Sequence, residues 1–427
     1  MPKPTVFGRY LLLDRIAYGG MAEVFRAKQF GEEGFDRVIA IKRVLPAVSD
    51  NEQFVAMFRD EANITRTLQH GNIAQVYDFG KLDGSYYLTM EYVSGLDLKT
   101  FFNACEQSGK PMHPAIAALI VREVALGLGY AHRATDSSGS SLGLIHRDVS
   151  PQNVLLSWQG EVKLVDFGIA KARISAYNTK DGVLKGKFEY MSPEQAAGEG
   201  ISPKSDIFCT GIILHEMLTG RRLFKTDSDV KTLEKIKAVA IDPPSVLNPA
   251  VPARLDALVM RALARDPADR FADAREMQTA LMEYLYPSSP DITRESIDRF
   301  MHELFVSEIE SERLRLDEGS KLAVGMYDAG PELDLEGDWL EESGGSAQTM
   351  QIEPSRRTVW MVVGVLLMLR RRRTGLGWRR STFSASPTCC AGRLSATRRQ
   401  VTSLGRSTLQ ACTCLSCVRP RSAMQSR

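Results

Sequence analysis

Three polar side chains occur at a spacing that suits a metal-bound triphosphate. Asp148, in His146-Arg147-Asp148, is followed by Asn153, and Asp166-Phe167-Gly168 begins thirteen residues after that Asn. Phosphoryl transfer from ATP needs a carboxylate that orients the attacking hydroxyl, and an Asp and an Asn that hold divalent metal on the triphosphate. The spacing therefore predicts Asp148 as the catalytic carboxylate. It predicts Asn153 and Asp166 as ligands of Mg2+, with Mn2+ as an alternative metal.

The phosphates of the nucleotide are expected at a glycine-containing turn near the N-terminus. Gly19 and Val24 fit the pattern G-x-G-x-x-G-x-V, whereas Ala17 and Ala22 stand in place of its outer glycines. A glycine turn lets backbone N–H groups approach phosphates closely. We expect nucleotide contacts along the whole turn, which consists of Ile16, Ala17, Tyr18, Gly19, Gly20, Met21, Ala22, Glu23 and Val24.

A lysine with an acidic partner is expected beside this turn. Lys42 ends an apolar run eighteen residues after Val24, which is the position of a lysine that pairs with the α- and β-phosphates. Its ammonium needs a carboxylate on the following helix. Glu61 is the first candidate, and Asp60 is the alternative that spacing alone does not remove.

The base of the nucleotide is expected where the last strand of this region ends. A purine needs backbone N–H and C=O groups at such a crossover, so we predict adenine contacts at Glu91 and Val93, with Asp97 near the ribose. The remaining positions of the predicted nucleotide site are Ala40, Met90 and Leu155.

Two kinds of element must position these residues. Short runs rich in Val, Ile and Tyr, bounded by Gly, Asp or Asn, predict strands at 10–17, 22–28, 38–44, 74–81 and 85–92. An apolar stripe through Phe54, Phe58 and Leu68 predicts one helix at 51–69. After Gly95 helical stripes predominate, at 97–108, 114–134, 204–219, 251–264 and 273–285. A small strand-rich lobe therefore precedes a larger helical lobe.

In this order the residues resemble the eukaryotic-like (Hanks-type) bacterial serine/threonine protein kinases over residues 10–285. Further matches are Ser192-Pro193-Glu194, Asp206 with Gly211, and Arg270. The resemblance implies an α+β, bilobal protein kinase fold, with a β-rich N-lobe at 10–92 and a helical C-lobe at 95–285. It also implies that Glu194 pairs with Arg270, that Asp206 braces the catalytic loop, and that His146 packs in the core.

The resemblance implies a non-specific serine/threonine protein kinase that transfers the γ-phosphoryl group of ATP to proteins, autophosphorylates, and acts in bacterial signalling. Tyrosine-specific relatives usually carry Arg between the catalytic Asp and the Asn, and this chain has Ser150-Pro151-Gln152 there. Arg147 beside Asp148 suggests control by phosphate on the following loop. Ser175, Tyr177 and Thr179 are the available hydroxyls, with Thr179 the first choice and a constitutively ordered loop the alternative.

Two departures from the family pattern affect the catalytic residues. Serine/threonine members usually carry Lys two residues after the catalytic Asp, where this chain has Ser150, and Gly-Thr where it has Gly186-Lys187. Our hypothesis is a reciprocal exchange, in which Lys187 supplies the cation and Ser150 the hydrogen bond. The alternative function is a pseudokinase scaffold that binds nucleotide without efficient transfer. Retention of Lys42, Glu61, Asp148, Asn153 and Asp166 favours an active enzyme.

The composition changes near residue 355. Fifteen of the 54 Lys and Arg are arginines of 355–427, a stretch without Asp, Glu or Lys, which leaves 39 basic against 52 acidic side chains in residues 1–354. Five of the seven Cys also lie in that end. The first 354 residues are therefore expected to be a cytoplasmic, disulfide-free body, and the N-terminus has no signal-peptide pattern.

Four segments follow the predicted kinase domain. An amphipathic helix at 291–316 is expected to pack on the C-lobe, with partner binding as the alternative. The acidic, Gly/Ser-rich stretch 317–357 is expected to be a disordered linker. The apolar segment 358–369 is shorter than the roughly 20 residues of a spanning helix. Residues 370–427, rich in Arg, Ser and Cys, are expected to be disordered or frameshifted.

The cationic end offers only weak binding signals. With the arginines at 370–373, the apolar segment predicts peripheral membrane association, or a single-pass anchor if the original reading frame continues it. The few aromatics of the tail support no specific nucleic-acid binding. Its Cys run has neither a following His nor a second Cys pair, which disfavours a zinc site.

Overall fold

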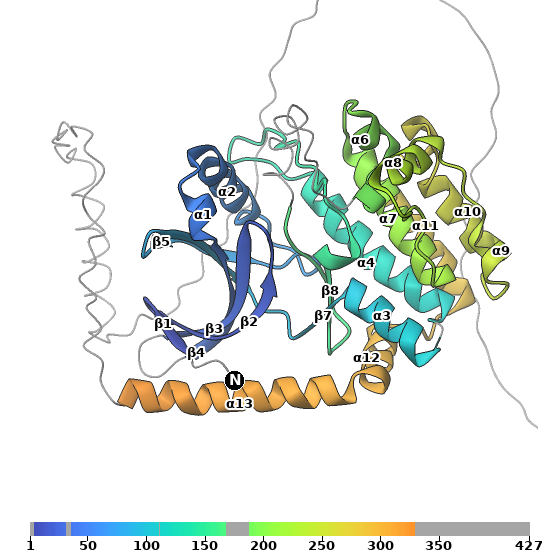
Figure 1. Cartoon of the computed structure of the whole chain (residues 1–427). Coiled ribbons are helices and arrows are strands. Elements are labelled where there is room, and N and C mark those ends of the chain that lie inside the picture. The colour runs from blue at the N-terminus through green and yellow to red at the C-terminus, as the bar shows by residue number, and fades with distance from the viewer. Residues whose placement is uncertain (1–3, 31–35, 111, 168–187, 329–427) are drawn as a thin grey trace, which may run out of the picture. The chain divides into compact units, whose positions relative to one another are not determined.

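The N-terminal lobe is a single antiparallel sheet crossed by one long helix. The computed structural model describes residues 4–30, 36–110, 112–167 and 188–328 (Figure 1). The strands follow the order β1-β2-β3-β4-β6-β5. Their bounds are β1 Thr5–Phe7, β2 Tyr10–Tyr18, β3 Ala22–Phe30, β4 Asp36–Val44, β5 Val76–Leu82 and β6 Ser85–Glu91. Helices α1 Pro46–Ser49 and α2 Glu52–Thr65 connect β4 to β5. The buried face of α2 carries Phe54, Met57, Phe58 and Ala62, which pack with Ala40, Leu88 and Met90 of the sheet.

The C-terminal lobe is mainly helical. A small sheet of β7 Gly95–Asp97, β8 Val154–Ser157 and β9 Val162–Leu164 lies at its start. Its helices are α3 Leu98–Ser108, α4 Pro114–His132, α6 Pro193–Ala197, α7 Pro203–Thr219, α8 Asp229–Ala238, α9 Pro244–Leu247, α10 Ala253–Ala262 and α11 Ala274–Ser288, with short 3-10 turns at Pro151–Asn153, Phe188–Tyr190 and Pro267–Asp269. Buried residues of α4, α7, α10 and α11 form one continuous core.

Helix α4 is apolar on nearly all sides because it runs through this core. It is the one helix, among the described residues, that is long and apolar enough to cross a membrane, and 72% of that stretch is buried inside the protein. Such burial is what a central helix of a packed lobe shows.

The predicted kinase fold is confirmed. Each strand predicted in the N-lobe and each helix predicted between 51 and 285 has a counterpart whose ends differ by at most a few residues. The strands that periodicity did not indicate are β1, β7, β8 and β9. They span three or four residues each, which is too short for an alternating pattern to show.

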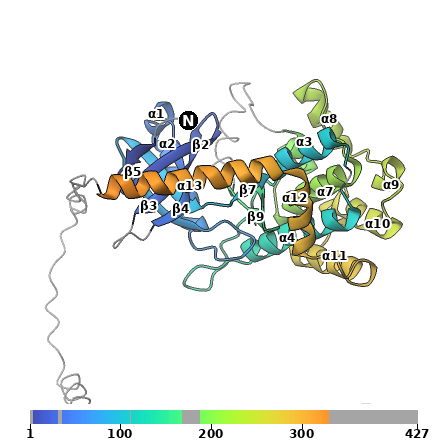
Figure 2. The same ribbon diagram turned by 90° about the horizontal axis from the view of Figure 1, so that it is seen from below.

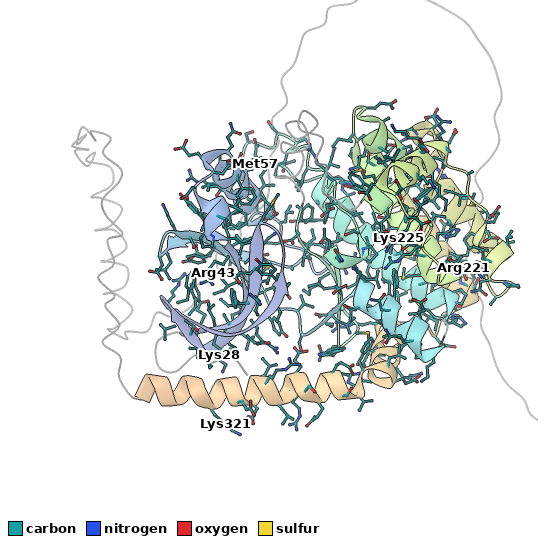
Figure 3. The ribbon with its side chains drawn as sticks, viewed as in Figure 1. Lys28, Arg43, Met57, Arg221, Lys225 and Lys321 are labelled. Carbon is teal, nitrogen blue, oxygen red and sulfur yellow. The ribbon has the colours of Figure 1, made fainter. Side chains whose placement is uncertain are left out.

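The segment after α11 differs from the sequence prediction. Instead of one helix at 291–316 there are two, α12 Arg294–Leu304 and α13 Val306–Asp328, separated at Phe305. Residues 317–328, predicted to be disordered, continue α13. Ion pairs of Arg313 with Glu310 and of Lys321 with Asp317, three and four residues apart, support this acidic helix. In Figure 3 Lys321 extends away from the lobes, and its side chain is 74% exposed.

Helices α12 and α13 contact different parts of the protein. Helix α12 packs on the C-lobe through Ile297 and Met301, and the ring of Phe300 lies 5.7 Å from that of Phe101 on α3. Helix α13 continues past β7 to the N-terminal sheet (Figure 2), where Gly319 meets Leu13 of β2. The predictions for 329–357, 358–369 and 370–427 lie outside the described residues.

Candidate active site

Lys42 lies at the centre of a charged cluster between the lobes. Its Nζ is 2.7 Å from Asp166 Oδ1 and 4.0 Å from Glu61 Oε1. The Glu61 side chain, on the inner face of α2, is 9% exposed, whereas Asp60 lies on the exposed face of the same helix. Glu61 is therefore the carboxylate that the helix brings to Lys42.

The charge of Lys42 is set by its neighbours. Burial by itself would lower the pKa of its ammonium, but the carboxylates of Asp166, Glu61 and Asp148 together raise the pKa above its usual value. A cation surrounded by three carboxylates stays protonated at neutral pH. Lys42, Asp148 and Asp166 thus lie within electrostatic reach of one another.

Asp148 and Asn153 form one unit of the catalytic loop. Asn153 Nδ2 donates to the Asp148 carboxylate at 2.7 Å and to the Asp148 carbonyl oxygen at 2.8 Å. The backbone of Asn153 also accepts from Val165 N at 3.0 Å, one residue before Asp166. The amide nitrogen of Asn153 is thus committed to Asp148, which leaves its oxygen as the atom suited to a hard cation.

The Asp206 carboxylate holds the backbone of the loop that carries Asp148 and Asn153, as predicted. Its carboxylate accepts from Arg147 N at 2.9 Å and from His146 N at 2.8 Å, and it lies 2.7 Å from His132 Nε2. Arg147 has a φ of 68° and Asp166 a φ of 56°, a left-handed conformation that is costly for residues with a side chain. The bracing by Asp206 therefore maintains a backbone conformation that Arg147 would not otherwise favour.

His146 packs in the core, which confirms the prediction for that residue. It is fully buried, and its ring lies 4.5 Å from that of Phe167. Burial lowers the pKa of His146, so the imidazole is neutral. Its contacts with Phe167 and with the Val165 carbonyl oxygen support the loop.

Glu194 and Arg270 form a buried bidentate ion pair, as predicted. The two contacts are 2.8 and 2.9 Å, and Ser205 Oγ donates to the same carboxylate at 2.6 Å. Burial would raise the pKa of Glu194, but the hydrogen bonds from Arg270 and Ser205 outweigh it and lower the pKa to about 2. This pair joins the start of α6 to the segment before α11 and has a structural role.

The glycine turn is the hairpin between β2 and β3. Gly19 N donates to Ala22 O at 2.9 Å, and Ala17 faces Val24 across the two strands. The side chains of Ile16, Tyr18 and Met21 are 45%, 66% and 45% exposed. The Glu23 carboxylate forms ion pairs with Arg43 at 2.7 Å and with Arg15 at 3.4 Å. The Glu23 side chain therefore stabilises the sheet.

Further predicted nucleotide positions lie on β3, β4, β6 and β8. Val24 faces Lys42, and Ala40 faces Met90, in adjacent strands. Because directly opposed residues share a face of a sheet, these four side chains lie on the same face. Leu155 lies on β8 of the C-lobe, opposite Asp97 and Lys163.

Two predicted nucleotide contacts already have partners within the protein. The Glu91 carboxylate pairs with Lys163 at 2.7 Å and accepts from Gln75 N, and Glu91 N donates to Gln75 O. Asp97 caps helix α3 by accepting from Lys99 N and Thr100 N, each at 3.0 Å. Contact of Asp97 with ribose remains a prediction, and so does contact of Val93 with adenine.

Some predicted residues cannot be placed. Lys187, Gly168 and the loop hydroxyls at 175, 177 and 179 lie outside the described residues. Ser150 is described and is 1% exposed, and within the described part of the chain its hydroxyl has no hydrogen-bond partner.

Two neighbours of the site were not predicted. Lys163 is a buried cation in the strand β9, whose other two residues are apolar. A lysine between apolar residues is visible in the sequence and could have indicated this neighbour. Glu312 reaches the connection between the lobes from α13, and no local pattern around it indicates that contact.

Comparison with known proteins agrees with this geometry. The protein kinase domain family matches residues 10–283. The chain belongs to the protein kinase family. This kinase is 41% identical over 288 residues to "Tyrosine-protein kinase MasK" of Myxococcus xanthus, covering 67% of the chain and 44% of MasK. It is 36% identical over 275 residues to "Serine/threonine-protein kinase PrkC" of Bacillus subtilis, covering 64% of the chain and 40% of PrkC.

A solved structure shows the same fold. The crystal structure of the kinase domain of PknI from M. tuberculosis matches this kinase with a TM-score of 0.50 and 28% identity, over 65% of this chain and 96% of that domain. The resemblance to bacterial Hanks-type kinases is thus confirmed. The chain spans less than half the length of MasK and of PrkC.

Proposed function

We propose that this kinase transfers the γ-phosphoryl group of ATP to Ser and Thr hydroxyls of protein substrates, including its own chain. The observation that supports this most directly is the cluster in which Lys42 contacts Asp166 and Glu61 beside the Asp148–Asn153 pair. A scaffold that only bound nucleotide would not need a loop carboxylate held in place by Asn153. Because the reaction consumes ATP, we place this domain in the cytoplasm.

The residues present fit a divalent metal and ATP. Asp166 offers a carboxylate and Asn153 an amide oxygen, which are the ligand types that Mg2+ prefers. The metal, when bound, neutralises charge that develops on the phosphates. Lys42 would hold the α- and β-phosphates, with Glu61 fixing its ammonium, and the hairpin at 16–24 would cover the triphosphate. At the base, the Glu91 carbonyl oxygen is the group that we assign to adenine.

Asp148 is the residue that we assign to the substrate hydroxyl. A carboxylate that accepts the hydroxyl hydrogen bond orients the oxygen toward the γ-phosphorus and takes its proton as the new P–O bond forms. The hydrogen bond from Asn153 fixes the Asp148 carboxylate, and Asp206 fixes the backbone of the two residues that precede Asp148. The enzyme therefore contributes mainly positioning and electrostatics.

Tyrosine is the second candidate substrate. It is favoured by the 41% identity to MasK, which is named a tyrosine kinase, and by Ser150 in the position where serine/threonine kinases usually carry Lys. PrkC, named a serine/threonine kinase, is 36% identical. Because the two relatives differ in this property, the hydroxyl class must be measured.

Labelling of the full chain tests the proposal. The purified protein is incubated with γ-labelled ATP and Mg2+ or Mn2+, and the labelled amino acids are separated after acid hydrolysis. We expect phosphoserine and phosphothreonine in the wild type and much less of both in Asp166→Asn at the same Mg2+ concentration, while Asp291→Asn, an exposed control, behaves as wild type. Phosphotyrosine alone would support the second candidate. Nucleotide binding without any labelling would support the pseudokinase alternative.

A further inference from the structure

Glu312 of α13 is buried at the connection between the two lobes. Its side chain is 8% exposed. It accepts hydrogen bonds from Tyr92 Oη, from Ser94 Oγ at 2.8 Å and from Trp158 Nε1 at 2.6 Å. Tyr92 and Ser94 belong to the segment between β6 and β7, and Trp158 follows β8. One carboxylate outside residues 10–283 thus binds the interlobe segment and the C-lobe together.

The same carboxylate lies beside a buried arginine of the N-lobe. Arg26 on β3 is 3% exposed and makes two hydrogen bonds of 2.8 Å to Asp14. Its guanidinium lies 5.3 Å from the centre of the Tyr92 ring. Arg26 Nη1, 3.8 Å from Glu312 Oε1, has no hydrogen-bond partner within the described residues. The Glu312 charge therefore adds to that of Asp14 beside Arg26, and through this contact Glu312 reaches the N-lobe.

The protonation of Tyr92 suits this arrangement. Burial raises the pKa of the Tyr92 phenol, and the hydrogen bond to Glu312 raises it further. The phenol is thus neutral at physiological pH and available as a donor. The buried Glu312 carboxylate is stabilised by three hydrogen-bond donors and a nearby guanidinium. Without this acceptor the same buried donors would lack a hydrogen-bond partner, which is costly.

Helix α13 is held on both sides of Glu312. Before it, the ring of Phe305 lies 5.9 Å from that of Trp158 and 6.2 Å from that of Phe101. After it, Gly319 is buried against β2, where a Cβ atom would lie 2.9 Å from Leu13 Cδ1. Only glycine permits this approach without moving Leu13. These contacts fix the position of the Glu312 side chain against the interlobe segment.

We propose that Glu312 is a positioning residue for nucleotide binding, acting through Tyr92 and Ser94. This inference rests on the proposed function, in which adenine binds at Glu91, and on the predicted contact of adenine with Val93. The two residues lie on either side of Tyr92. Without the Glu312 carboxylate the interlobe segment adopts its binding conformation for a smaller fraction of the time. The apparent dissociation constant of nucleotide rises in inverse proportion to that fraction. The functional unit therefore includes residues up to Gly319.

Calorimetric titration of the full chain with Mg-ADP tests this role. Glu312→Gln keeps the side-chain shape and removes the charge, and we expect it to weaken ADP binding about tenfold, as a tenfold smaller competent fraction implies. Glu310→Gln is the matched control, because Glu310 lies on the exposed face of the same helix and pairs only with Arg313 among the contacts described. It should bind ADP as wild type does.

Steady-state kinetics separate positioning from general stability. We expect Glu312→Gln to raise KM for ATP about tenfold while kcat changes less than about twofold, because phosphoryl transfer in the bound state is unaffected. An unchanged dissociation constant with a lower melting temperature would overturn the proposal, since Glu312 would then serve stability alone. A wild type that binds no ADP would instead contradict the proposed function, and the positioning role with it.

A second variant decides the question if Glu312→Gln does not fold. Tyr92→Phe removes one donor to Glu312 and keeps the ring beside Arg26. We expect weaker ADP binding by a factor of about three, in line with the loss of one hydrogen bond of several. ADP binding equal to that of wild type in a folded Tyr92→Phe protein would overturn the proposal.

Discussion

Lys42 Nζ and Asp166 Oδ1 lie 2.7 Å apart although the two residues are separated by 124 positions in the sequence. The contact joins β4 of the N-lobe to the segment after β9 of the C-lobe. Both residues are assigned to the triphosphate, Lys42 to its phosphates and Asp166 to its metal. The two charges that we assign to ATP and its metal thus form an ion pair across the two lobes.

Replacement of Lys42 is expected to abolish most activity. Lys42→Met removes the only phosphate-binding cation that we assign to β4, and loss of such a charge at a transferring group lowers the rate by about 100-fold or more. The measurement is the initial rate of label transfer at saturating ATP. Lys81→Met, a change at an exposed lysine of β5, is the control. Full activity of Lys42→Met would contradict the assignment of this site.

Activity is expected to depend on divalent metal through Asp166. Chelation should stop label transfer, and added Mg2+ should restore it. Asp166→Asn removes the charged ligand, so the concentration of Mg2+ needed for half-maximal activity should rise about tenfold or more, because hard cations prefer carboxylate oxygen. A metal titration of wild type and variant measures this shift. Transfer that persists after chelation would show that no metal acts here.

The Glu194–Arg270 pair is expected to stabilise the fold in a pH-dependent way. The pKa of Glu194 is lowered from 4.5 to about 2. A carboxylate with a depressed pKa contributes stability above its unfolded pKa, near 4.5, and loses that contribution as the pH falls toward 2. At pH 7 the free energy of unfolding of wild type should therefore exceed that of Glu194→Gln by about 3 kcal/mol.

Denaturant unfolding between pH 7 and pH 3 measures the effect of this pair. The difference between wild type and Glu194→Gln should narrow below about pH 4.5. Arg261→Met is the control, because the Arg261–Glu276 pair is exposed and exposed pairs contribute about 1 kcal/mol or less. A difference that stays constant across this range would show that the stabilisation does not come from the ionised carboxylate.

Local patterns predicted most of the fold, and contacts over long distances in sequence were predicted only where a motif specified them. Apolar periodicity identified α2 but could not decide whether Asp60 or Glu61 pairs with Lys42, because adjacent residues are only about 100° apart around a helix. In the structure Glu61 is buried on the inner face of α2, and this packing decides between the two. The roles of Asp206 and Arg270 came from the motif order. Asp97, assigned to ribose, caps α3, since an Asp before a helix is also a good N-cap.

The end of the described chain was the least predictable part. An acidic composition indicated disorder from 317, but composition carries no information on tertiary contacts. Glu312 is buried only because Tyr92, Ser94 and Trp158 meet it from elements about 150 to 220 residues earlier. A single glutamate in an acidic helix gives no sequence signal of such burial.

The unusual Ser150 leads to the last prediction. Ser150 follows Asp148, the carboxylate that we assign to the substrate hydroxyl, by two residues and is buried without a hydrogen-bond partner among the described residues. In the exchange hypothesis Lys187 supplies the cation that a Lys at position 150 would provide. Lys187→Thr should therefore raise the barrier to transfer by about 2–4 kcal/mol. Lys185→Thr, two residues away, is the matched control. The double variant Ser150→Lys with Lys187→Thr should recover activity relative to Lys187→Thr, which a double-mutant cycle of kcat/KM measures. Additive effects, or full activity of Lys187→Thr, would show that the two positions act independently.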